Sequence, residues 1–469
     1  MSITFQDLPN ELLGYCFSYL AKYSAHKDIQ SVRLVSKRFH DVSSSFLLTQ
    51  VELRLTKQSF QELESIASHA IFSKTVRRLL FNVSYYDGML ADSFQDFAEH
   101  NGTELEILLE DLERGGFSEQ LDTVQTVCDE WLEATNEDYN HEKATRYQQI
   151  LAKAHTEYTE LYKSQQNLLD GANWLSALVP ALKKLSALKI IVMKDSTERL
   201  AMPGRWWKAL ATDEGLTSRC LATSEWKGSF HTAISTQPPV HIIPDLFMAL
   251  EKTTIRPYHF EINVTVPSDL RSLRMSTEQL QAISTTLSAS KKLYFSAREW
   301  ARRGSLAENN DRPRDEMAVL AALTNSFYHN PQITELHLSL DNYPCFLEIP
   351  TLSLVDLLPS PVPFSPKLRR MYLRNVPMTI AELEVLVEHL RPTLVWLVFY
   401  SPYLHAPNDE SWEQALNVLR KFEALEHFEL KVPAGGGLGD GLPDEELCRK
   451  FVMRESNENP LVGWGLQRG

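Results

Sequence analysis

Residues 368–375 read L-R-R-M-Y-L-R-N, and this stretch carries the pattern that decides the fold. Large apolar residues stand at its first, fourth and sixth positions. Because successive side chains of a β-strand point to opposite faces, Met371 and Leu373 would face a core while Tyr372 and Arg374 would point outward. The stretch therefore predicts a short strand with one buried face.

The same spacing recurs in segments that begin at Val76, Leu185, Ile255, Ile333, Leu394 and Leu425, with a weaker instance at Lys292. Helical periodicity fills several intervals, at residues 277–287, 314–327, 380–390 and 412–422. A strand followed by a helix at a recurring interval resembles the leucine-rich repeat, whose strands form one parallel sheet. The starts at residues 333, 368, 394 and 425 lie 35, 26 and 31 residues apart. Most of these intervals exceed the usual ~20–29 residues, and only Asn375 takes the repeat's asparagine position, so the repeats are degenerate.

The resemblance to leucine-rich repeats implies that the residues between the inward leucines point toward a partner. The candidate target-binding residues are Tyr372, Arg374, Trp396 and His427. Tyr372 and Trp396 are favoured among them because aromatic side chains often anchor protein interfaces. The alternative is that each is an ordinary solvated strand residue.

A different pattern occupies the first 48 residues. Residues 8–20 read L-P-N-E-L-L-G-Y-C-F-S-Y-L, where Pro9 suits the first turn of a helix and apolar residues follow along one helix face. A second short helix is expected to begin after Asp28, carrying Leu34 and Val35, and a third after Ser36. Three short helices enclose only a small core, so the module should gain stability from a partner.

Residues 8–20, together with V-R-L-V-S-K-R-F at residues 32–39, resemble the F-box motif. The resemblance implies binding to the Skp adaptor and, through it, to a cullin–RING scaffold of a ubiquitin ligase. The residues that it places at the adaptor are Leu8, Pro9, Leu12, Leu13, Phe17, Leu20, Val35 and Phe39. Cys16 stands where the family prefers isoleucine, Phe39 replaces a common tryptophan, and the connector at residues 21–27 is longer than usual. The alternative is a helical cap on the next domain, with the same residues as its core.

Residues 84–178 do not fit the repeat. Residues 84–142 hold 17 acidic residues and one basic residue, Arg114, among amphipathic helical patterns. This predicts a helical insertion in an early repeat. Its acidic residues form either a docking surface for a basic substrate or, as is more common, a solvated helix face.

Composition excludes several classes of function. The net charge of −14 over 469 residues disfavours a nucleic-acid binder, which needs a basic face. The five cysteines are far apart and form no C-x-x-C pair, which predicts reduced thiols in the cytoplasm or nucleus and no zinc site. No apolar run reaches the ~18 residues of a membrane span. No phosphate-binding loop, zinc-protease helix or nucleophile elbow is present, so we expect no enzyme, no cofactor and no metal.

The whole sequence predicts an α/β protein. It comprises a three-helix F-box module at residues 1–48, an irregular leucine-rich-repeat solenoid at residues 49–432 with the insertion at 84–178, and a C-terminal tail at 433–469. The long degenerate repeats with a charged insertion resemble fungal F-box proteins.

The expected function is that of a substrate receptor of an SCF-type (Skp–cullin–F-box) ubiquitin ligase. One alternative is an F-box interaction protein outside ubiquitination. Another is an enzyme on a repeat-like scaffold, which a deep polar pocket with convergent titratable groups would support.

Overall fold

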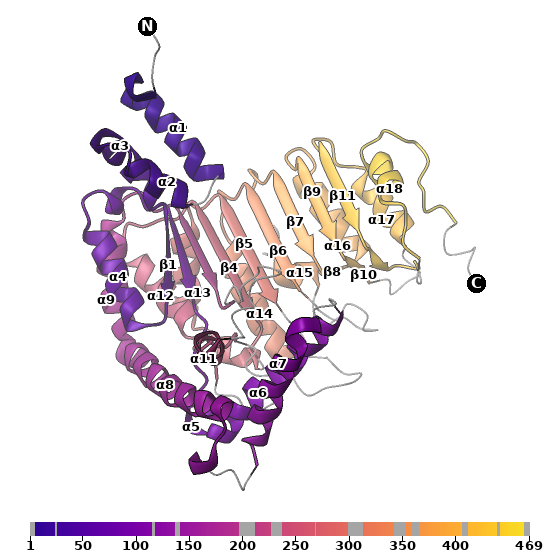
Figure 1. The fold of residues 1–469 in the computed structure, drawn as a ribbon. Helices are drawn as coiled ribbons and strands as arrows, with labels where there is room; N and C mark the ends of the chain where they lie inside the picture. Colours follow the sequence, from indigo (N-terminus) through magenta and orange to yellow (C-terminus); the bar gives the residue numbers. More distant parts are fainter. Residues whose placement is uncertain are drawn as a thin grey trace.

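Nine parallel strands form one sheet in the part of the chain that the structure describes, and they lie side by side in chain order (Figure 1). The structure is a computed structural model that describes residues 5–23, 26–114, 118–136, 141–196, 212–226, 237–267, 269–298, 313–341, 353–358, 365–405, 411–438 and 441–463. The strands are β1 (Gln50–Arg54), β2 (Arg78–Asn82), β3 (Ile190–Lys194), β4 (His259–Thr265), β5 (Lys292–Arg298), β6 (Glu335–Leu340), β7 (Arg370–Arg374), β9 (Trp396–Tyr400) and β11 (His427–Lys431). The expected α/β class with a large parallel sheet is confirmed.

One face of this sheet is buried beneath helices that follow the strands along the chain (Figure 1). The inward residues of β7 are Met371 and Leu373, as the sequence predicted, and those of β6 are Leu336 and Leu338. The covering helices are α4 (Lys57–Ser68), α9 (Asn173–Lys184), α12 (Ile242–Glu251), α13 (Thr277–Leu287), α14 (Arg314–Tyr328), α15 (Leu354–Leu357), α16 (Ile380–Leu390), α17 (Trp412–Leu419) and α18 (Glu445–Val452). Sheet and helices thus form two layers around one core.

The last three strands end in the same backbone conformation. Asn375, Ser401 and Val432 each follow a strand directly and have a positive φ of 52°, 47° and 49°. The chain then enters a short strand of a second parallel sheet, formed by β8 (Pro377–Met378), β10 (Tyr403–Leu404) and β12 (Ala434–Gly435). Asparagine tolerates this left-handed region, whereas the β-branched Val432 is strained in it. The backbone conformation therefore recurs at these three positions although the residue type changes.

Three helices precede the sheet: α1 (Asn10–Tyr23), α2 (His26–Arg33) and α3 (Lys37–Leu47). The Ser36 hydroxyl accepts a hydrogen bond from the Phe39 amide at 3.2 Å, which confirms the predicted start of α3. The predicted start of α2 was wrong, because the helix begins at His26 and Asp28 lies in its first turn. The helix also ends at Arg33, so Leu34 and Val35 project from a turn instead of a helix.

The expected helical insertion contains α5 (Gly88–Asp92), α6 (Phe94–Arg114), α7 (Ser118–Glu133) and α8 (Arg146–Leu169). These helices, with α11 (Asp213–Cys220), enclose a second hydrophobic core. Trp131 lies fully buried in it and donates its indole N–H to the carbonyl oxygen of Tyr147 at 3.0 Å. By contrast, Trp174 and Leu178 of α9 pack in the core beneath the large sheet.

At the start of the sheet, one strand was predicted in the wrong register and another was missed. The strand placed at residues 185–190 is instead β3 at Ile190–Lys194, and its Ile191 pairs with Leu79 of β2. The prediction was three residues out of register because Leu185, Leu188 and Ile190 repeat the apolar spacing of Leu188, Ile191 and Met193. Strand β1 was missed, although the alternation of Val51, Leu53 and Leu55 signals it.

The chain beyond residue 433 was expected to be a tail, but it contributes to the core. Cys448, Phe451 and Val452 of α18 pack beneath the sheet. Gly435, which follows β11, serves close packing, because a Cβ on it would clash with the carbonyl oxygen of Leu404. None of the helices in the described residues combines the length and apolar character that a membrane-spanning helix needs.

The corrected register of β3 predicts opposite outcomes for two adjacent isoleucines. Ile191 faces the core and is fully buried, whereas Ile190 is half-buried on the other face. We expect Ile191→Ala to lower the free energy of unfolding by about 2–5 kcal/mol because it leaves a cavity. Ile190→Ala should cost less than about 1 kcal/mol. Urea denaturation of both variants measures the difference, and equal losses would contradict this register.

Candidate functional site

The face of the sheet opposite the helices presents aligned rows of polar and aromatic side chains. We call it the open face. The register places Lys292, Glu335, Arg370, Trp396 and His427 in one row across five strands. Tyr294, His337, Tyr372, Val398 and Glu429 form the next row. The four residues predicted to bind a target, Tyr372, Arg374, Trp396 and His427, all lie on this face.

The predicted residues form two contacting groups on the open face. The rings of Trp396 and His427 stack with their centroids 3.5 Å apart. The ring of Tyr372 lies 4.2 Å from that of His337, which lies 5.2 Å from Tyr294. Tyr372 and Trp396 therefore lie on the adjacent strands β7 and β9 but belong to separate ring contacts.

Arg374 interacts with two other side chains of the protein. Its Nε lies 3.1 Å from Asp341 Oδ1, a close ion pair that is not aligned as a hydrogen bond. Its guanidinium also lies over the ring of Tyr400, 4.9 Å from the centroid. Arg374 is thus less available to a partner than its exposed position in the sequence pattern suggested.

A groove of about 260 Å³ runs between β5 and β9 on the open face. Its lining residues are Tyr294, Glu335, Leu336, His337, Arg370, Met371, Tyr372 and Trp396. Sequence reasoning identified Tyr372 and Trp396 but missed Arg370 and Glu335, because the groove exists only where strands distant in sequence lie in register. Alignment of the predicted strands would have revealed both residues.

Charges in this groove are fixed by burial and by hydrogen bonds. Burial alone would raise the pKa of Glu335, but hydrogen bonds from Lys292, at 2.7 Å, and from the Tyr294 hydroxyl hold that pKa below its ordinary value. Burial lowers the pKa of His337 to about 4, so its imidazole is neutral at pH 7. Glu335 is therefore a carboxylate, and His337 acts as an uncharged ring.

Arg370 lies opposite Glu335 in register and helps to lower its pKa, but it forms no ion pair within the described residues. It is exposed, and its guanidinium lies over the ring of Trp396, 5.8 Å from the centroid. Among the described residues no carboxylate lies within ion-pair distance of it. Its planar N–H groups remain free to bind an anion.

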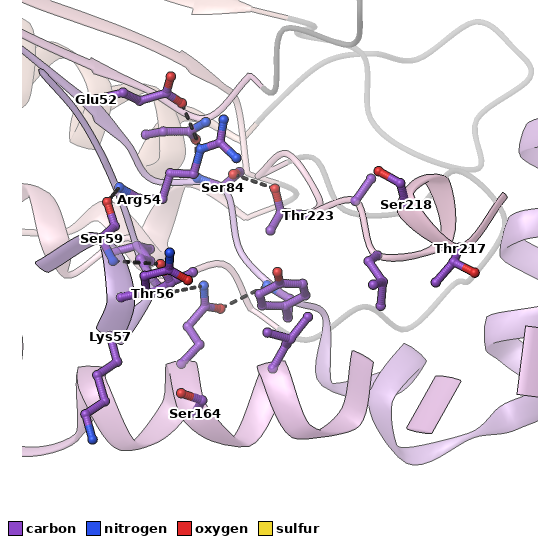
Figure 2. A pocket seen from close by; sticks show the side chains of 18 of the residues that line it. Glu52, Arg54, Thr56, Lys57, Ser59, Ser84, Ser164, Thr217, Ser218 and Thr223 are labelled. Atoms are coloured by element: carbon purple, nitrogen blue, oxygen red, sulfur yellow. Dashed lines mark hydrogen bonds and ion pairs between the residues drawn. The ribbon is translucent and has the colours of Figure 1, made fainter. Parts of the chain in front are cut away.

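A larger polar cavity, of about 1370 Å³, lies between β1, α4, α8 and α11. Figure 2 shows side chains around it. Among them, Ser84 is hydrogen-bonded to Thr223 at 2.7 Å, and Arg54 is hydrogen-bonded to Glu52 at 3.0 Å. The buried Gln165 accepts a hydrogen bond from the backbone N–H of Tyr86 and donates one to a backbone carbonyl oxygen. Much of the polar surface is thus satisfied within the chain.

This cavity is the kind of pocket that the enzyme alternative required. Its described lining contains neither histidine nor cysteine. Its Asp213 is paired with Arg146. A nucleophile activated by a histidine, as in serine and cysteine hydrolases, thus has no counterpart among these residues.

The residues that the structure describes include no group of three or more metal-ligating side chains that could hold a metal ion. Cys16, Cys128, Cys220 and Cys448 are free thiols, and Cys345 lies outside the described residues. Burial raises the pKa of the Cys128 and Cys220 thiols to about 12, so both stay protonated at neutral pH.

The helices α1 to α3 leave large apolar side chains in solvent. Leu12, Tyr15 and Tyr19 follow the spacing of one face of α1, and Leu34 and Val35 form the turn between α2 and α3. Leu34 is 88% exposed. We call these five residues the exposed apolar residues. A chain of this size rarely exposes so many large apolar groups in so short a segment unless a partner covers them.

The opposite face of α1 forms the small core of this module. Leu13 and Phe17 are buried there against Ile29 and Phe39, and the rings of Phe17 and Phe39 meet edge to face at 5.4 Å. These three predicted adaptor-binding residues, Leu13, Phe17 and Phe39, are therefore inaccessible in this structure and instead hold the helices together.

The other predicted adaptor-binding residues are accessible to different degrees. Pro9, Leu12 and Val35 are exposed, and Leu8 and Leu20 are half-buried against the small core. Sequence reasoning missed Tyr15, Tyr19 and Leu34. The sequence placed Leu34 in the second helix because the end of α2 at Arg33 carries no glycine or proline signal.

Comparison with known proteins gives one match. Residues 5–50 match the F-box domain family, and this range contains α1, α2 and α3. A comparison of the chain with curated proteins gave no match. The chain therefore contains an F-box domain at residues 5–50, and this domain supports a general role as an F-box adaptor in SCF-type ubiquitin ligases.

Proposed function

We propose that the chain is a substrate-receptor subunit of an SCF-type E3 ubiquitin ligase. Its F-box domain binds a Skp-type adaptor, and the open face of its sheet binds a protein target. The observation that carries this proposal is the F-box domain at residues 5–50 with large apolar side chains that its own core leaves in solvent.

The adaptor-binding surface consists of the exposed apolar residues together with Pro9 and the partly buried Leu8 and Leu20. Full burial of a leucine or valine side chain contributes roughly 1.5–3 kcal/mol. Leu34 is 88% exposed and Leu12 is 47% exposed, so a partner gains most of this energy from Leu34 and about half of it from Leu12. Leu13, Phe17 and Phe39 act indirectly, since they fix the orientation of α1 relative to α3.

The strand–helix units behind the open face are proposed to be diverged leucine-rich repeats of the kind seen in fungal F-box proteins. The chain order of the parallel strands and the recurring left-handed residue after β7, β9 and β11 support this. Target contact is assigned to Tyr372, Trp396 and His427, with Arg374 beside them.

The chain itself performs no chemistry in this proposal. It holds a target lysine near a charged ubiquitin-conjugating enzyme and so raises the effective concentration of the two reactants. It uses no cofactor and acts in the cytoplasm or nucleus, where the cullin–RING scaffold works.

Adaptor binding is expected to depend on the exposed leucines of the F-box. The double substitution Leu12→Asp and Leu34→Asp should raise the Kd for a purified Skp-type adaptor by about 100-fold or more, because two desolvated contacts are replaced by charges. Isothermal titration calorimetry measures the change. Neither side chain belongs to the small core of the module, so the circular dichroism spectrum should stay the same.

The matched control is Leu442→Asp, which changes another largely exposed leucine far from the F-box. It should leave the adaptor affinity within twofold of wild type. If the wild-type chain fails to bind the adaptor, or if the double variant binds it as tightly as wild type, the proposed surface is wrong.

A receptor for degradation and an interaction protein outside ubiquitination differ in their effect on the target. Depletion of the chain should lengthen the half-life of proteins that bind the wild-type open face but not a Trp396→Ala variant. A cycloheximide chase with and without proteasome inhibition measures this. Bound proteins whose half-lives do not change would favour the role outside ubiquitination.

A further inference from the structure

The cations around the groove differ in what they contact. Four of the five basic side chains on β5, β7 and β11 have a carboxylate partner within the chain: Lys292 with Glu335 at 2.7 Å, Arg298 with Asp195 at 2.6 Å, Arg374 with Asp341 at 3.1 Å and Lys431 with Glu429 at 2.8 Å. Arg370 is the fifth, and it contacts the ring of Trp396 instead. Glu335, opposite Arg370 on β6, is hydrogen-bonded to Lys292 and Tyr294, so Arg370 helps to lower its pKa from a distance but forms no ion pair with it.

The orientation of Arg370 leaves it ready to bind. A cation–π contact with an indole ring favours one orientation of the guanidinium without using its N–H donors. A carboxylate that approaches from solvent can accept two of these N–H groups in a bidentate arrangement. Less conformational entropy is then lost on binding than for a freely moving arginine.

The remaining walls of the groove suit an apolar or aromatic neighbour of that carboxylate. Tyr294, His337 and Tyr372 form one side, and burial keeps His337 uncharged at neutral pH. A volume of about 260 Å³ is small for a whole metabolite. It fits one or two side chains of a peptide that lies across the strands.

We propose that this groove binds an acidic peptide segment of the target, with Arg370 as the carboxylate-binding residue and Trp396 and Tyr372 as the walls for a neighbouring side chain. This rests on the proposed function, because it specifies the chemistry of the target that the open face receives. A chain with a net charge of −14 would otherwise repel acidic partners, so a cation that forms no ion pair within the described residues selects where one can dock.

A carboxylate suits the groove better than a phosphate group. Phosphate recognition generally uses a cluster of arginines, and the groove offers one free guanidinium. The Glu335 carboxylate lies in the same groove, and it repels a dianion more strongly than a monoanion.

The test uses the full-length chain in complex with a Skp-type adaptor. The probe is a fluorescein-labelled synthetic peptide of alternating glutamate and tyrosine, titrated by fluorescence anisotropy at low salt. We expect binding that is about tenfold tighter than that of a matched lysine–tyrosine peptide. Arg370→Gln should weaken binding of the acidic peptide about tenfold, and Trp396→Leu should weaken it about as much.

The matched control is Arg369→Gln, which removes the same charge from the adjacent exposed residue outside the groove. It should change the affinity less than twofold. Equal binding of the acidic and basic peptides, or equal effects of the two arginine substitutions, would overturn the proposal. Binding of only a phosphotyrosine version of the peptide would also overturn it, in favour of a phosphate site.

Failure of this inference and failure of the proposed function have different outcomes. Adaptor affinity is measured for every variant, and Arg370→Gln should leave it unchanged because the groove lies on β5 to β9. A complex that binds the adaptor but not the acidic peptide rejects the groove assignment alone. A chain that binds the peptide but no adaptor rejects the receptor role and leaves the groove assignment standing.

Discussion

Alternation of side chains along parallel strands is the constraint on which the rest of the structure depends. Each strand directs one set of residues, such as Leu336 and Leu338, into the helix-covered core. The residues between them therefore lie on the open face. A shift of one residue in a strand would exchange the two sets, so burial of the leucines also fixes the positions of Tyr372 and Trp396. The core thus determines which side chains a partner can meet.

The sequence predicted the class of fold because the signals were local. The spacing of Leu368, Met371 and Leu373 marks a strand without any knowledge of its neighbours, and α13 and α16 were predicted with the bounds that the structure shows. The F-box domain was predicted for the same reason, from a continuous stretch of residues. Errors arose where two registers fit equally well, as at β3, or where a helix ends without a breaker residue, as at Arg33.

The candidate sites were predicted less completely because they depend on contacts between distant segments. Tyr372 was a candidate from its own strand, but its groove needs Tyr294 and Trp396, which stand 78 residues before it and 24 residues after it in the sequence. Which F-box residues are exposed depends on how tightly three helices pack. Phe17 and Leu12 belong to the same apolar stripe in the sequence, yet Phe17 fills the small core and Leu12 lies in solvent.

The order of the strands also sets a distance. The F-box helices connect directly to β1 at one end of the sheet, and the groove begins four strands further along (Figure 1). With neighbouring strands about 4.8 Å apart, anything held between β5 and β9 sits roughly 20–35 Å from β1. Insertion or loss of a single strand–helix unit would therefore change the distance between the F-box helices and the groove by about one strand spacing, without altering either of them.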